Sequence, residues 1–423
     1  MPPCRRAESR VYSQGVLPLD CRLEFDLARE EEFFASLPPR PAVFALEPSV
    51  LLGSGVAPYL SRTGNLRRRL ERLLGAPAEG SPRLNLRGFA GAVCYRLTGS
   101  DFEQTLIFYQ HARRLFPSRF RDWARLRPPA LVKVNLANPY PRCYVTRRII
   151  SDGGFYFGPF PTRRAAETFL VEFLSLFRVR RCLIRIRRDP SFPGCIYSEM
   201  KMCLAPCFAG CTKAEYDVEV ERLTGFLASA GNSLLSELEG ERMLASEATD
   251  YERAAAVHKR HAKVAAVVRG LPELAGPLQE LEALVLQRAA EENTVALFVV
   301  RGGLIDDPFF LRFDELASQP RSAEQILRER LEAGGNATER AEEEVPENAS
   351  GVLADHVSIL SRWYYANPHD GEVFFAARFR SGSRSRSWPY RRIIRACSRL
   401  LRPRAEGKPA SLPFPPENPP ETV

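Results

Sequence analysis

Four cysteines lie within the twenty residues FPGCIYSEMKMCLAPCFAGC, 192–211, in a chain that has only ten cysteines. Cys182 lies just before this stretch. Together with Cys195, Cys203 and Cys207 it forms a C-x12-C-x7-C-x3-C series, and Cys211 follows. Four thiolates can hold a tetrahedral zinc ion or an iron–sulfur cluster. The series therefore predicts a metal-bound segment in the middle of the chain.

The spacing leaves the identity of the metal open. Zinc sites usually contain two closely spaced cysteine pairs, and only the last pair here is close, which favours a cluster. Disulfides are disfavoured because the opening MPPCRRAESR has no apolar segment behind its positive charges, so we expect no secretion signal. Unliganded thiols are the remaining alternative. Cys94, Cys143 and Cys397 lie in apolar segments and are expected in the core.

The composition favours a multidomain protein that binds nucleic acid. The chain has 423 residues, which exceeds one domain of about 100 to 200 residues. No apolar run approaches the roughly 20 residues that cross a bilayer, so we expect a soluble cytoplasmic protein without membrane contact. The net charge is +9, and most of the cations are arginines, which bind phosphate in bidentate geometry. A GC-rich genome is the alternative explanation for the arginines.

Hydrophobic periodicity predicts an α+β, multidomain fold. Residues 65–75 place leucines at helical spacing before a glycine, and residues 129–136 and 142–150 form a strand pair. The expected units are an N-terminal extension (1–36), a small α/β domain (37–125), a strand and helix linker with the cysteines (126–212), a helical hairpin (213–277), a C-terminal α/β unit (278–404) and a disordered proline-rich tail (405–423).

Several motifs resemble those of UvrC, the incision subunit of bacterial nucleotide excision repair. They are YPRCYVTRR (140–148), YFGPFPTRRAAETFL (156–170), FRVRRC (177–182), the cysteine series ending in CLAPC, and DYERAAAVHKR (250–260). The resemblance covers about residues 37–310. It implies a GIY-YIG nuclease-like first domain, an iron–sulfur cluster on the four cysteines of the series, a UVR-like motif that docks on UvrB, and a C-terminal remnant of an RNase H-like domain.

The resemblance allows the nuclease residues to be checked one by one. Such a site needs a tyrosine near the attacking water, a cation for the phosphate and a glutamate for a divalent metal. Tyr59 stands at the position of the family's second tyrosine, and Arg69 stands at that of the helix arginine. Arg62 stands where the family has a lysine and supplies the same charge with a different geometry.

The remaining catalytic positions are lost. Phe44 stands where the first tyrosine is expected, and Phe108 stands at the glutamate position. Glu103 lies about one and a half helical turns earlier, on another face, and is a poor substitute. Without a carboxylate, neither Mg²⁺ nor Mn²⁺ is expected to bind, which predicts a degenerate nuclease. In the RNase H-like segment, Asp306 and Asp307 are expected to be ordinary turn residues.

The motif at 250–260 is expected to dock on UvrB through a helix face of small residues. The face consists of Tyr251, Ala254, Ala255 and Val257, with Glu252 and Arg253 at its rim. His258 and Lys259 replace an Arg-Asp pair common in the family, which is expected to weaken or redirect docking. An ordinary alanine-rich helix within the protein's own bundle is the alternative.

Two arginine-rich runs are candidates for DNA binding, through phosphate contacts and base stacking. The first contains Arg113, Arg114, Arg119, Arg121, Arg125 and Arg127 among Phe116, Phe120 and Trp123. The second covers residues 378–404. A solvated arginine face is the alternative for each run.

The sequence thus favours a UvrC-like excision repair protein that binds DNA and UvrB and has a degenerate nuclease site. An active, metal-dependent, single-incision endonuclease of the UvrC type is the second hypothesis, with Glu103 as the metal ligand. A redox-sensing or iron-sensing scaffold is the third.

Overall fold

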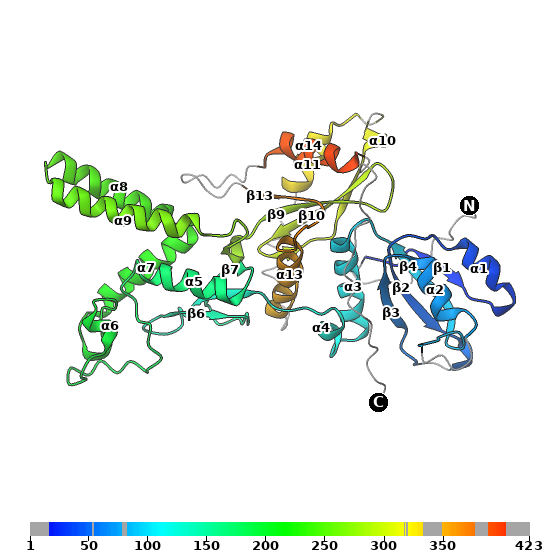
Figure 1. Cartoon of the computed structure of the whole chain (residues 1–423), viewed down its shortest axis with the longest axis horizontal. Helices are drawn as coiled ribbons and strands as arrows, with labels where there is room; N and C mark the ends of the chain where they lie inside the picture. The colour runs from blue at the N-terminus through cyan, green and yellow to red at the C-terminus, as the bar shows by residue number, and fades with distance from the viewer. Residues whose placement is uncertain are drawn as a thin grey trace.

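The computed structural model describes residues 17–52, 55–77, 83–316, 318, 320–332, 349–376 and 388–402. They form three antiparallel sheets with helices packed on them, which confirms a mixed, multidomain arrangement. Figure 1 shows the first sheet at one end, the C-terminal sheet in the centre, and the cysteine segment with a long helical hairpin at the other end. Within the described ranges, no helix is long and apolar enough to cross a membrane. The predicted tail at 405–423 lies outside them.

The first sheet has two cores, one on each face. Its unit comprises β1 (Cys21–Glu24), α1 (Glu30–Ser36), β2 (Ala42–Pro48), β3 (Tyr59–Thr63), α2 (Leu66–Leu74), β4 (Ala90–Leu97), α3 (Asp101–Leu115) and α4 (Phe120–Trp123), with 3-10 turns at Leu27–Arg29 and Val50–Leu52. The strand order is β1-β4-β2-β3. Successive residues of β2 point to opposite faces, so Phe44 packs with the leucines of α2, whereas Val43 and Ala45 pack with α3.

This unit begins before residue 37, so the predicted boundary is wrong. Strand β1 pairs with β4, with Cys21 opposite Tyr95. Phe25 and Phe33 are buried in the core that contains α2, and their rings meet edge to face at 5.0 Å. A four-residue strand and a short acidic helix give too little periodicity for the sequence to reveal them.

The middle sheet carries helix α5 and leads into the cysteine segment. Its strands have the order β6-β5-β7-β8. The elements are β5 (Ala130–Val134), β6 (Cys143–Thr146), β7 (Phe155–Phe160), α5 (Arg163–Leu174), α6 (Ile196–Glu199), a 3-10 turn at Pro206–Phe208, α7 (Lys213–Ala228) and β8 (Gly276–Pro277). The apolar stripe of α5 is part of the core: Phe169 stacks on Phe173, and Phe173 meets Phe226 of α7 at 5.2 Å.

The predicted helical hairpin consists of α8 (Asn232–Glu247) and α9 (Tyr251–Arg269). The two helices run side by side and project from the end of α7 (Figure 1). Their seam contains the buried residues Leu234, Leu238 and Ala245 of α8 and Val257, Val264 and Val267 of α9.

The C-terminal sheet is covered on both faces. Its elements are β9 (Ala283–Arg288), β10 (Thr294–Arg301), β11 (Leu304–Ile305), β12 (Phe309–Arg312), α10 (Phe313–Leu316), α11 (Ala323–Glu332), α13 (Ala349–Tyr364), β13 (Glu372–Phe375) and α14 (Tyr390–Leu401), with a 3-10 turn at Leu278–Glu280. Val285 and Phe298 face α13 and α3, whereas Leu284 and Leu297 face α11 and α14. Strand β13 pairs antiparallel with β9. The RNase H-like assignment of this unit stays a prediction.

Helix α3 lies between the first sheet and the C-terminal unit, and this arrangement positions the nuclease-like site. Phe102 meets Phe298 of β10 at 5.0 Å and Trp363 of α13 at 5.3 Å, both edge to face. On its other side α3 packs on β2 and β3. The helix is therefore buried on most of its circumference, including its polar residues Glu103, Gln104 and Thr105.

Candidate functional site

Two of the nuclease residues lie together on the α2 face of the first sheet. The Arg69 guanidinium donates a hydrogen bond to the Tyr59 hydroxyl at 3.4 Å. Phe44 lies beside them, with its ring centre 6.4 Å from that of Tyr59, and is fully buried. A phenylalanine at this position contributes packing but no hydroxyl.

Arg62 and Phe108 meet on the opposite face of the same sheet. Arg62 pairs with Val43 in the register of β3 and β2, which points it toward α3. Its guanidinium donates to the Thr105 hydroxyl at 2.7 Å, lies 3.7 Å from the Asp101 carboxylate, and sits 5.8 Å from the centre of the Phe108 ring. Burial lowers the pKa of Arg62, while Asp101 raises it. The structure thus separates Arg62 from Tyr59 and Arg69.

Glu103 does not replace the missing glutamate. Its side chain is 1% exposed and accepts a hydrogen bond from the backbone N–H of Gly99 at 2.8 Å, just before α3 begins. Burial raises the pKa of Glu103. In the part of the chain that the structure describes, no three His, Cys, Asp or Glu side chains converge as a metal site.

A polar network joins α3 and α4 to α13. The Tyr109 hydroxyl donates to the Asp355 carboxylate at 3.4 Å, and Arg121 forms a two-point contact with that carboxylate at 2.9 and 3.3 Å. The His356 ring meets Tyr109 edge to face at 5.5 Å, and its Nδ1 accepts a hydrogen bond from the backbone N–H of Ile305 at 2.9 Å. Burial raises the pKa of Tyr109 to about 12 and lowers that of His356 to about 4.

The first four arginines of the first candidate DNA-binding run have different surroundings. Arg121 is engaged by Asp355, and Arg113 donates to the Tyr109 hydroxyl at 3.4 Å. Arg114 and Arg119 are exposed.

The aromatic residues among these arginines belong to the core. Phe120 is 8% exposed and meets Tyr109 at 5.8 Å, so its predicted stacking on bases is wrong. Phe116 and Trp123 contact each other at 4.2 Å and pack against the same core. These rings pack α4 against α3.

Helix α14 lies within the second arginine-rich run. Its apolar residues Ile393 and Cys397 are buried, and Arg399 forms a bidentate ion pair with Glu372. Trp388 is 6% exposed and therefore also packs in the core. Residues 378–387 of the run lie outside the described ranges.

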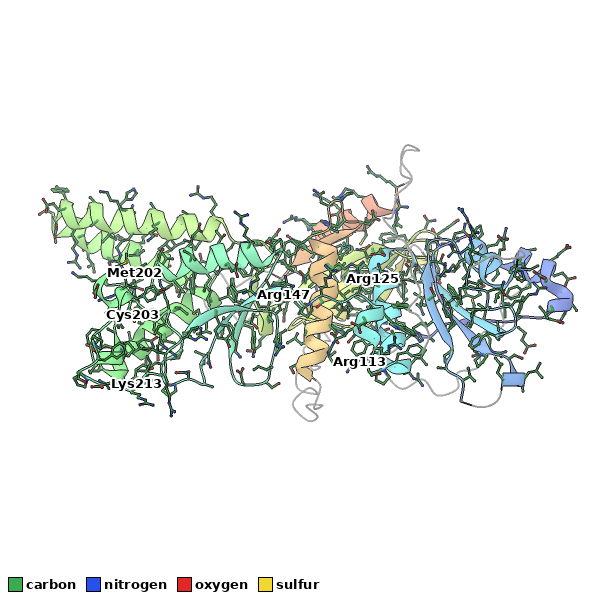
Figure 2. The ribbon with its side chains drawn as sticks, turned by 60° about the horizontal axis from the view of Figure 1, so that its bottom comes forward. Arg113, Arg125, Arg147, Met202, Cys203 and Lys213 are labelled. Atoms are coloured by element: carbon green, nitrogen blue, oxygen red, sulfur yellow. The ribbon has the colours of Figure 1, made fainter. Side chains whose placement is uncertain are left out.

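The four cysteines of the series come near one another in space. The charges of Cys182, Cys195 and Cys207 all act on Cys203, whose pKa burial raises to about 11. Cys203 and Cys207 are 7% and 6% exposed, and Cys182 and Cys195 are half-buried. Figure 2 shows Cys203 and Met202 in this lobe at one end of the molecule. Cys211 packs in the core of the middle unit instead.

Hydrogen-bond donors lie close to three of these sulfurs. The backbone N–H of Ala205 donates to the Cys203 sulfur at 3.3 Å, and Phe208 supplies a backbone hydrogen bond to Cys207. A guanidinium nitrogen of Arg180 lies 4.0 Å from the Cys182 sulfur. The donor set therefore fits a metal–thiolate group, although the thiols must draw closer together to share one.

Arg180 fixes the path of the chain into this segment. It is 4% exposed and donates to the backbone oxygens of Tyr140 and Ile184, both at 2.8 Å. Its own backbone N–H donates to the hydroxyl of Tyr216 in α7. The motif FRVRRC thus links the middle sheet, the cysteines and α7.

The residues predicted to dock on UvrB lie at the tip of the hairpin. Tyr251 is 75% exposed, and Met243 and Leu244 of α8 are 58% and 64% exposed. Glu252, Arg253 and Ala255 are exposed and Ala254 is half-buried. Val257 was expected in the docking face, but it is 4% exposed in the seam with α8, because it lies on the other side of the helix.

Asp306 and Asp307 are both engaged. Asp306 forms an ion pair with Arg301, and Asp307 accepts a hydrogen bond from Gln110 of α3 at 3.4 Å. They follow the short strand β11, whereas the turn of this segment lies before it, at Gly302 and Gly303.

Comparison with known proteins matches the middle of the chain to one family. Residues 130–226 match the model for the UvrC/Cho excinuclease, middle domain. A UvrABC system protein C of Dehalococcoides mccartyi is 28% identical over 273 residues, which cover 64% of this chain and 44% of that protein. That of Moorella thermoacetica is 24% identical over 310 residues, covering 72% and 49%. The chain is a divergent UvrC-like protein.

This UvrC-like chain spans about half the length of the curated relatives it matches, or less. No solved structure matches it. The family match contains the strands β5, β6 and β7, helix α5 and the whole cysteine series, and it ends within α7. The cysteine segment is therefore part of the region that matches the UvrC/Cho middle-domain model.

Nothing in the sequence analysis pointed to the network of Tyr109, Asp355 and His356 in this UvrC-like protein. Tyr109 and Asp355 are 246 positions apart. Asp355 and His356 follow one another among the apolar residues of α13, and an acid beside a histidine in such a helix is the signal that could have drawn attention to them.

Proposed function

We propose that this UvrC-like chain is a nucleotide excision repair protein that binds DNA, docks on UvrB, and has a nuclease-like unit that does not cut DNA. The observation that carries the proposal is Phe108. It is 7% exposed and lies under the Arg62 guanidinium, where the resemblance calls for a metal-binding glutamate. Hydrolysis of a phosphodiester by this route needs a metal ion. The phenyl ring of Phe108 supplies no ligand for it, and the carboxylate of Glu103 is buried and accepts a hydrogen bond from Gly99.

Incision of lesion-bearing duplex tests this proposal directly. The unmodified chain would be incubated with UvrA, UvrB and either Mg²⁺ or Mn²⁺, and nicked products would be resolved by size. We expect stable DNA binding without metal-dependent nicks. Nicks that require the metal would overturn the proposal.

A single-incision endonuclease of the UvrC type is the second candidate function. The retained contact between Tyr59 and Arg69 favours it, because these residues would orient water and phosphate. A Tyr59→Phe variant separates the two. If the unmodified chain nicks DNA and this variant does not, the second candidate replaces the first.

The four cysteines of the series are proposed to hold an iron–sulfur cluster, with zinc as the alternative. Two observations support this proposal: the charges of Cys182, Cys195 and Cys207 act on Cys203, and backbone N–H groups are directed at Cys203 and Cys207. When bound, the group would clasp the segment between α5 and α7. Anaerobic purification followed by iron, sulfide and zinc analysis distinguishes the two metals.

The tip of the α8–α9 hairpin is proposed as the UvrB docking surface. Three large apolar side chains, Met243, Leu244 and Tyr251, are exposed there, which is costly for a surface without a partner. Pull-down of UvrB by the unmodified chain, compared with a Leu244→Ser and Tyr251→Ser variant, tests it. Equal recovery of UvrB by both chains would contradict this docking surface.

A further inference from the structure

Positive charge is concentrated where the first unit joins the middle sheet. From residue 113 to residue 151, ten positions are Arg or Lys and only Asp122 is acidic. Arg121 pairs with Asp355, and Lys133 pairs with Asp152 just beyond the stretch. Because the cations far outnumber the single acid of the stretch, positive charge is in excess at this junction.

The register of the middle sheet brings two parts of this stretch together. Leu131 of β5 lies opposite Thr146 of β6 in an antiparallel pair. The chain before β5 therefore runs beside the chain after β6, which places Arg147 and Arg148 next to the segment that contains Arg125 and Arg127. All four arginines are exposed.

Helix α13 of the C-terminal unit packs beside the same junction of the first unit and the middle sheet. It contacts both α3 and β7, and the Tyr365 hydroxyl just beyond its end donates to the backbone oxygen of Pro159 at 2.9 Å. Arg362 lies on its exposed side, and the charges of Arg362 and Arg125 both act on Arg62. Figure 2 shows Arg125 and Arg147 on the two sides of this helix, in one view of the molecule. We call Arg125, Arg127, Arg147, Arg148 and Arg362 the arginine belt.

The positive charge of the belt is not neutralised by carboxylates in the part of the chain that the structure describes. Among the residues that the structure describes, no carboxylate lies within ion-pair distance of any of its five guanidinium groups. Five like charges drawn from three parts of the fold repel one another, and an external polyanion removes that repulsion. The nearby rings of Phe116, Phe120 and Trp123 pack into the core, so the belt offers cations but little aromatic surface for unpaired bases.

We propose that the arginine belt binds the phosphate backbone of duplex DNA across the junction of the three units. This inference rests on the proposed DNA-binding function and names the surface that performs it. Guanidinium groups would contact phosphates without reading bases, so binding is expected to be independent of sequence and strongly dependent on salt.

The test compares two variants that lose the same charge. The belt variant carries Arg125→Gln, Arg127→Gln, Arg147→Gln and Arg148→Gln. The control variant carries Arg242→Gln, Arg269→Gln, Arg321→Gln and Arg330→Gln, four exposed arginines on α8, α9, α11 and the segment before α11. Binding of a short fluorescent duplex of mixed sequence would be measured by anisotropy over a range of salt concentrations, after thermal unfolding has confirmed that each variant is folded.

We expect the belt variant to lose at least about tenfold in affinity and the slope of log K against log salt to fall by about 3 to 4, since each phosphate contact contributes about 0.9. The control should resemble the unmodified chain. Equal losses in both variants, or in neither, would overturn the belt while the DNA-binding function stands. Failure of the unmodified chain to bind any DNA would overturn the proposed function itself. Tighter binding of single-stranded DNA or of RNA than of duplex would overturn the choice of partner.

Discussion

The guanidinium carbon of Arg62 lies 5.8 Å from the centre of the Phe108 ring. An aromatic face attracts a cation, so Phe108 stabilises the Arg62 guanidinium where it lies. A phenyl ring cannot ligate a metal. In the function proposed above, this pair keeps a positive charge and its packing and supplies no carboxylate for a metal ion.

Truncation of Phe108 should therefore affect stability rather than catalysis. Phe108→Ala removes a buried ring from the core shared by α3 and the C-terminal unit, and we expect it to lower the free energy of unfolding by about 3 to 5 kcal/mol. Phe108→Leu is the matched control and should cost less, because most of the volume is kept. Urea unfolding measures both. Equal stability of the alanine variant and the unmodified chain would mean that the ring is not packed as described.

Removal of Arg121 should weaken the joint between α4 and α13. Asp355 is 3% exposed, and without Arg121 its carboxylate keeps only the long hydrogen bond from Tyr109. We expect Arg121→Gln to destabilise the protein by about 1 to 3 kcal/mol, the cost of an unsatisfied buried charge. The double variant Arg121→Gln with Asp355→Asn should recover part of that loss. A recovery of zero in a double-mutant cycle would contradict a direct interaction.

His356 should make the protein less stable in mild acid. Burial lowers its pKa from the ordinary value of about 6.5 to about 4 in the folded state. Between these two values the unfolded chain binds a proton that the folded chain excludes, so stability is lost as the pH falls from about 6.5 toward about 4. At pH 5 the loss amounts to about 2 kcal/mol.

The matched variant for this pH dependence is His356→Asn. Its side-chain oxygen can accept the hydrogen bond from Ile305 that Nδ1 accepts, but it does not titrate. Chemical unfolding at pH 7 and pH 5 should show a larger decrease for the unmodified chain than for the variant. If the two decreases are the same, His356 is not the group responsible.

The cysteines should divide into ligands and packing residues. Cys203→Ala is expected to abolish bound iron or zinc, whereas Cys211→Ala is expected to retain it and to cost only core packing, since Cys211 belongs to the apolar core beside Tyr216. Metal content per chain and the absorbance of the purified protein measure the outcome. Loss of metal from both variants would place Cys211 among the ligands.

Local patterns predicted the elements whose partners are close in sequence. The leucines of α2 and the strand pair β5–β6 follow from short-range spacing, and the structure has them where the sequence places them. The assignment of the cysteine series to a metal site stays a prediction.

Long-range packing could not be predicted in the same way. Helix α3 contains Gln104, which reads as a surface residue, but its amide donates to the backbone oxygen of Thr63 at 2.9 Å inside the protein. Phe120 and Trp123 alternate with arginines, as in a surface on which bases stack. In the structure they pack instead in the core that includes residues of α13. In each case the partner that determines burial comes from a distant part of the chain.

The burial of α3 between two sheets also has a consequence for synthesis of the chain. Tyr109 waits for Asp355, which the ribosome adds 246 residues later, and Phe102 waits for Phe298 and Trp363. Until then the emerging first sheet carries an uncovered apolar helix. The nascent N-terminal half is therefore expected to need a chaperone, and a gene fragment that encodes it alone is expected to yield aggregates rather than a free-standing domain.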